Sequence, residues 1–84
     1  PMNKEEIVSI ISRKLKLVRT EYNFSQDKMA DILGLSKKTL IQIEKERTEL
    51  SWTACIAVCA IFRESEILRM SFGEDPVKLV QTIA

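Results

Sequence analysis

Apolar residues recur along most of this chain at intervals of three and four, which is the spacing of one face of an α-helix. The first such stripe consists of Ile7, Ile10, Ile11, Leu15 and Val18. Asn3 followed by Glu6 has the form of a capping box, so we expect a helix over about residues 4–22. No run shows the alternation with a period of two that marks a hairpin strand. The pattern therefore predicts an all-α fold.

Two short amphipathic helices follow, separated by a tight turn. Ser25 is a suitable N-cap for the first helix, and Gly34 ends it. Ser36 can cap the second helix, which turns Leu40 and Ile43 inward. The apolar residues expected between the two helices are Met29, Ala30, Leu33, Leu35, Leu40 and Ile43. Helices joined by so short a turn must cross at a large angle, which is the helix-turn-helix arrangement.

The rest of the chain is also helical in pattern. An apolar helix should open at Leu50 or Ser51, and since it is apolar on nearly all sides it lies in the core or partly in a subunit interface. Ser65 can cap a fifth helix, and Pro76 suits the first position of a short terminal one. A chain of 84 residues fits one compact domain. We expect a single five- to six-helix domain over residues 1–84, with the motif at 25–47 and a short extension at 72–84.

Charge and composition exclude several function classes. Thirteen Lys and Arg against twelve Asp and Glu leave a net charge of +1, so only the placement of charge can argue for a nucleic-acid partner. The chain has no histidine, no glycine-rich phosphate loop and no nucleophile with a visible base, so we expect no enzyme and no cofactor. Cys55 and Cys59 stand in an apolar stretch and are expected to be buried, reduced and free of metal.

Neither a membrane span nor a secretory leader is expected. The apolar run from Ala54 to Phe62 is far shorter than the roughly 20 residues that a spanning helix needs. Lys4, Glu5 and Glu6 stand where a signal peptide would become apolar. We therefore expect a cytoplasmic protein.

The segment FSQDKMADILGLSKKTLIQIEKER, from Phe24 to Arg47, resembles the family of the phage Cro and cI repressors. Bacterial members of that family are often called xenobiotic-response-element-type regulators. Leu15 and Arg19 before the segment and the apolar helix after it extend the resemblance over about residues 15–62. The resemblance implies a lambda-repressor-like DNA-binding fold and double-stranded DNA as the partner.

The resemblance also implies roles for single residues. Gln26 corresponds to a glutamine that contacts a DNA phosphate and braces the recognition helix, and Ser25 is a further candidate for a phosphate contact. The positions expected to face the DNA from the recognition helix are Ser36, Lys37, Lys38, Thr39 and Gln42. Those expected to grip the backbone from the next loop are Lys45, Arg47 and Thr48. Arg19 and Glu44 correspond to a pair that ties the first helix to the recognition helix.

Physical chemistry agrees with these roles. Lysine can donate to guanine O6 and N7, and glutamine can form two hydrogen bonds with adenine. Lys37 and Lys38 stand at a helix N-terminus, where positive charge is unfavourable, and this placement favours an external anion such as DNA.

Glu46 departs from the family pattern, which usually has glycine just after the position of Lys45. A non-glycine residue at positive φ costs roughly 1 kcal/mol, so either the recognition helix runs on or the loop has another shape. Glu46 and Glu49 also add negative charge near the expected phosphate path.

These observations predict a sequence-specific transcriptional regulator that represses by occupying its operator. Because one such unit offers few contacts, we expect a homodimer on a palindromic site. The alternative is an antitoxin-like or adaptor protein that uses the same fold to bind a protein partner, which the near-neutral charge favours. If the tail from Phe72 to Ile83 is not packed on the domain, it is the expected partner surface.

Overall fold

Each helix in this computed structural model, which describes residues 2–84, begins after a side chain that accepts a backbone N–H. Six helices occupy this range: α1 (Lys4–Glu21), α2 (Gln26–Leu33), α3 (Lys37–Glu44), α4 (Trp52–Ile61), α5 (Glu66–Phe72) and α6 (Pro76–Ile83). Their N-caps are Asn3, Ser25, Ser36, Ser51, Ser65 and Asp75. No strand occurs within residues 2–84. The prediction of an all-α fold is therefore confirmed, and the six helices are consistent with the lambda-repressor-like type that the resemblance implies.

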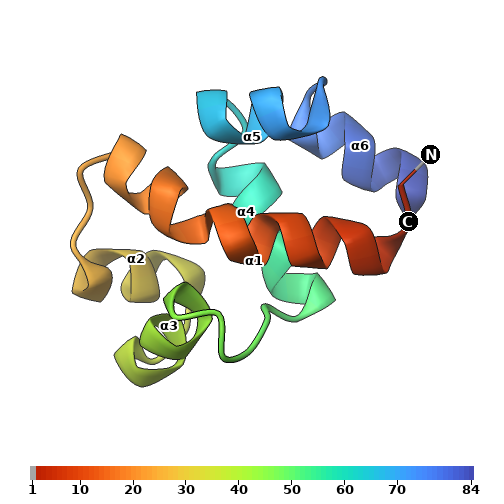
Figure 1. The fold of residues 1–84 in the computed structure, drawn as a ribbon. Helices are drawn as coiled ribbons and strands as arrows, with labels where there is room; N and C mark the ends of the chain where they lie inside the picture. The colour runs from red at the N-terminus through yellow and green to blue at the C-terminus, as the bar shows by residue number, and fades with distance from the viewer. Residues whose placement is uncertain (1) are drawn as a thin grey trace.

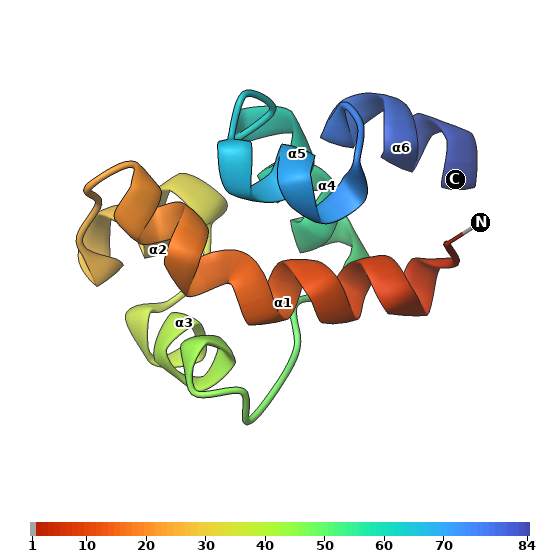
Figure 2. The same ribbon diagram turned by 45° about the horizontal axis from the view of Figure 1, so that its top comes forward.

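The long helix α1 runs through the middle of the molecule, and most other helices pack on it (Figure 1). In both views α3 lies below α1 and α5 lies above it, so these two helices cover opposite sides (Figure 2). The stripe that faces the core consists of Ile7, Ile11, Leu15 and Val18, all of which are fully buried. Ile10, predicted to belong to that stripe, is only partly buried at its edge.

The apolar helix α4 packs one face against the core and leaves the other exposed. Cys55, Val58 and Cys59 are buried, whereas Ile56 and Ile61 remain 37% and 51% exposed. One face of this helix therefore lies in the core, as predicted, whereas the other is an uncharged surface for which a subunit interface stays a prediction.

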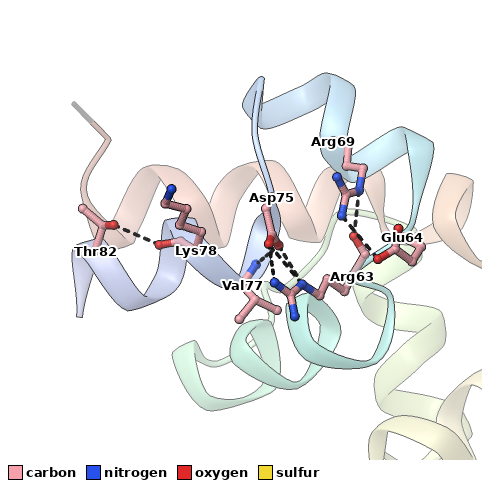
Figure 3. Close-up of polar contacts among 7 residues, drawn as sticks. All are labelled: Arg63, Glu64, Arg69, Asp75, Val77, Lys78 and Thr82. Carbon is pink, nitrogen blue, oxygen red and sulfur yellow. Dashed lines mark hydrogen bonds and ion pairs between the residues drawn. The ribbon is translucent and has the colours of Figure 1, made fainter.

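The C-terminal tail packs on the domain. Pro76, Leu79 and Val80 are buried, and α6 contacts both α4 and α5. The Arg63 guanidinium holds the tail from the end of α4, because it donates to Asp75 Oδ2 at 3.0 Å from Nε and at 2.6 Å from a terminal nitrogen (Figure 3). The tail is thus not the open partner surface that the sequence left possible.

A long-range cap fixes α5 to the end of α1. The Ser65 hydroxyl donates to Glu21 Oε1 at 2.5 Å, and the Glu66 backbone N–H donates to Glu21 Oε2 at 2.7 Å. A carboxylate at a helix N-terminus satisfies an otherwise unpaired amide and interacts favourably with the helix dipole. This contact holds α5 on the side of α1 that faces away from α3.

Candidate nucleic-acid interface

The turn between α2 and α3 is closed by local hydrogen bonds. Gly34 adopts the left-handed conformation with a φ of 68°, which a residue without Cβ reaches at little cost. The Leu35 amide then donates to the Ala30 carbonyl oxygen at 2.9 Å. The Ser36 hydroxyl accepts from the Thr39 amide at 3.0 Å and so starts α3. The turn has the short, capped form that the spacing predicts.

Helix α3 buries one face and presents the other to solvent. Leu40 and Ile43 are almost completely buried, and α3 packs against both α1 and α2. Met29 and Ala30 supply the buried residues of α2. The first turn of α3 is exposed, and the whole helix lies at the opposite edge of the molecule from α5 and α6 (Figures 1 and 2). A rigid helix with one free face is therefore available to an external partner.

A buried ion pair ties α3 to α1, as the sequence predicts. Arg19 Nε donates to Glu44 Oε2 at 2.6 Å, and a terminal guanidinium nitrogen donates to Oε1 at 3.0 Å. The two side chains are only 13% and 4% exposed. Burial by itself raises the pKa of Glu44, but hydrogen bonds from Arg19 and Gln26 outweigh it and hold that pKa below its ordinary value.

Gln26 joins this pair from the first residue of α2. Its side-chain amide donates to Glu44 Oε1 at 3.1 Å, and its side chain is partly buried. The remaining guanidinium nitrogen of Arg19 donates to the Phe24 carbonyl oxygen at 2.9 Å. One network thus connects α1, the start of α2 and the end of α3. The second N–H of the Gln26 amide has no protein acceptor within residues 2–84.

The residues predicted to face DNA are spread over α3 and the loop behind it. Those on the exposed surface are Ser36, Lys37, Lys38, Thr39, Lys45, Arg47 and Thr48, whereas Gln42 is partly buried. The Ser36 hydroxyl also forms a hydrogen bond of 2.9 Å with Thr39 Oγ1, so both of its hydrogen bonds lie within the first turn of α3.

Asp27 provides an internal partner for Lys37 that the sequence analysis missed. Lys37 Nζ lies 3.4 Å from each oxygen of the Asp27 carboxylate. This carboxylate of α2 partly offsets the charge of Lys37 at the helix N-terminus, so the placement of Lys37 favours an external anion less than the sequence suggests. Lys38 forms no ion pair within residues 2–84, so its placement favours an external anion as the sequence suggests.

Comparison with known protein families supports this geometry. The model of a family described as a helix-turn-helix domain matches residues 12–83. The chain belongs to this helix-turn-helix domain family. No curated protein and no solved structure matches the chain in the same comparisons. Family membership indicates a DNA-binding regulator, while the closer resemblance to Cro and cI stays a prediction.

The loop after α3 of this helix-turn-helix domain follows neither of the two predicted courses. Helix α3 ends at Glu44, and Glu46 takes a φ of 59°, the left-handed conformation that the family usually assigns to glycine. The Glu46 amide donates to the Ile43 carbonyl oxygen at 2.9 Å, and the Arg47 amide donates to that of Gln42 at 3.0 Å. These two hydrogen bonds are those of the Schellman motif, the common C-terminal cap of a helix. Glu46 therefore has a Cβ at positive φ, which is strained, while α3 keeps this common cap.

Metal ligands, thiols and membrane-spanning helices were sought within residues 2–84 of the helix-turn-helix domain. No group of three or more His, Cys, Asp or Glu side chains is placed to hold a metal ion there. Cys55 and Cys59 are free thiols with no exposed surface, as the sequence predicts, and burial raises their pKa values to about 12 and about 11. None of the described helices combines the length and apolar character that crossing a bilayer requires.

Proposed function

We propose that this helix-turn-helix domain is a sequence-specific transcriptional repressor that binds double-stranded DNA and reads the major groove with α3. One observation carries the proposal: α3 exposes a polar and cationic first turn while its other end is held by a buried ion pair to α1. A recognition element must be presented in a fixed orientation, and packed helices position side chains better than loops do. The chain acts by occupying an operator, without chemistry.

The exposed residues divide into two roles. Lys38, Thr39 and Gln42 project from α3 and are proposed to contact base edges, with Lys37 and Ser36 beside them. Lys45, Arg47 and Thr48 follow in the loop, where we assign contacts to phosphate oxygens. The second N–H of the Gln26 amide is assigned to a phosphate at the start of α2. The first role selects a sequence, and the second positions the protein on any duplex.

A homodimer on a palindromic operator completes the proposal. One domain with a single short recognition helix presents too few contacts for tight specific binding, and two copies double them. The exposed Ile56 and Ile61 of α4, on a helix without any charged residue, support self-association. We place this regulator in the cytoplasm.

The test measures binding of random and selected duplexes across a salt series. Each phosphate contact should contribute about 0.9 log units to the slope of log affinity against log salt. Gln42→Ala should weaken the selected site by about 1–3 kcal/mol and relax selectivity at one position per half-site. Arg47→Ala should weaken all sequences alike and flatten the slope. Lys78→Ala, which removes an exposed lysine of α6 away from α3, is the matched control and should change neither.

A protein partner is the second candidate, supported by a groove between α1 and α5. This groove of about 240 Å³ is lined by Lys14, Leu17, Ile67, Met70 and Ser71. Leu17 is 47% exposed and Met70 is 79% exposed, so the groove has an apolar lining that a protein partner would cover. A flat salt response, together with no preference for any duplex, would favour this reading and refute DNA recognition.

A further inference from the structure

The ion pair between Asp27 and Lys37 joins the first turns of α2 and α3, the two helices of the motif. The Lys37 ammonium lies 3.4 Å from both carboxylate oxygens. The side chains stay 75% and 50% exposed, so solvent screens their attraction. Exposed pairs of this kind contribute little to folding stability. Apart from the favourable interaction of a first-turn carboxylate with the dipole of α2, the pair therefore adds little stability, yet it places negative charge on the surface assigned to a polyanion.

The pair changes what Lys37 can offer to DNA. A carboxylate beside a lysine lowers the positive potential around it, so the pair adds less to sequence-independent binding than a lysine without a partner would. The ammonium still has three N–H groups, and the carboxylate does not occupy all of them. While the ammonium stays beside Asp27, it is biased toward acceptors near the first turns of α2 and α3, where the proposed function places a base edge.

We propose that Asp27 is a specificity-determining residue that withholds the Lys37 charge from phosphates and restricts it to base acceptors. The inference rests on the proposed function and deepens it, because it assigns selectivity to a residue of α2. Without the carboxylate, the flexible lysine side chain swings freely and reaches whichever phosphate is near. Random duplexes then gain a contact, whereas the selected operator gains little.

The experiment compares Asp27→Asn with the unmodified protein on a random duplex and on an operator selected from a random pool. On the random duplex, affinity should rise about threefold to tenfold, and the salt slope should steepen by about 0.9 per subunit. On the operator, the gain should stay below about twofold, so that the ratio of the two affinities falls. Thermal unfolding of each variant establishes that the fold is intact.

Two controls separate this role from simple charge removal. Asp31 is an exposed carboxylate one turn further along α2 with no ion pair within residues 2–84, so Asp31→Asn should leave the affinity ratio unchanged. In a Lys37→Ala background, Asp27→Asn should raise both affinities equally, because no lysine remains to be released.

An unchanged affinity ratio in Asp27→Asn would overturn the role of Asp27 while leaving DNA binding intact. An equal fall of the ratio in Asp31→Asn, or in the Lys37→Ala background, would do the same. Failure of the unmodified protein to bind any duplex would refute the proposed function and this inference together.

Discussion

Replacing Arg19 with alanine should destabilise this helix-turn-helix domain strongly, because it strands a buried carboxylate. The Glu44 side chain is 4% exposed and accepts two hydrogen bonds from Arg19 and one from Gln26. Only the Gln26 donor, at 3.1 Å, would remain. Removing one partner of a buried pair costs about 3–5 kcal/mol. Since Arg19 itself is 13% exposed, we expect a loss at the lower end, about 3 kcal/mol.

The converse substitution should cost less. In Glu44→Ala the guanidinium keeps its hydrogen bond to the Phe24 carbonyl oxygen and lies closer to solvent, so we expect a loss of about 2 kcal/mol. The double variant should lose less than the sum of the two, by a coupling energy of about 1–3 kcal/mol. Arg13→Ala is the matched control, since Arg13 is an exposed arginine of the same helix without an ion pair within residues 2–84.

Urea and thermal unfolding followed by circular dichroism would measure these losses. In a domain of this size each kcal/mol corresponds to about 4–8 °C in Tm, so Arg19→Ala should melt at least about 12 °C lower. Arg13→Ala should stay within about 0.5 kcal/mol of the unmodified protein. Losses below about 1 kcal/mol in both single variants, adding up in the double variant, would show that the pair behaves as a surface pair and would refute the reasoning.

Three further outcomes follow from single sites. The Cys55 and Cys59 thiols, whose pKa values burial raises to about 12 and about 11, should react with an alkylating reagent near neutral pH only after unfolding; rapid labelling of the native protein would contradict this. Glu46→Gly should raise the free energy of unfolding by about 0.5–1 kcal/mol, because it removes a Cβ at a φ of 59°; a loss measured by urea unfolding would show that the loop is not strained. Hydrogen bonds from Arg63 lower the pKa of Asp75, so its contribution is present above the unfolded pKa of about 3.9 and is lost as pH falls through the folded pKa. Melts of Asp75→Asn against pH should therefore lose part of the acid sensitivity of the unmodified protein, and identical profiles would contradict this.

Local chemistry made the helices predictable. Four of the six N-caps, Asn3, Ser25, Ser36 and Ser65, were assigned from the sequence, because each cap bonds an amide only three residues away. Gly34 was likewise recognisable as the end of α2, since its left-handed φ is a property of one residue. The spacing between Gly34 and Ser36 then determines how α2 and α3 can be joined. The helix-turn-helix arrangement therefore follows from interactions within one short segment.

Long-range contacts escaped that reasoning. Glu21 caps α5 by binding Ser65 and Glu66, which lie 44 and 45 residues further along the chain, and no local sequence pattern predicts this contact. Arg19 and Glu44, 25 residues apart, were paired only through a resemblance. Each of these contacts exists because the packing of apolar faces brings two helix ends together. Nothing in the local sequence around either side chain indicates which distant residue will become its partner.

The sequence by itself determined the helical elements, the turn between α2 and α3, and the set of polar residues on the outer face of α3. Only the tertiary structure decided which hydrogen-bond and ion-pair partners the polar residues of α2 and α3 have. It directs the Gln26 amide to Glu44 and the Lys37 ammonium to Asp27, and it forces Glu46 into a glycine-like conformation. The physical reason is that periodicity reports which side of a helix is polar, whereas the partner of a polar group depends on the distance between elements that only the packed core sets.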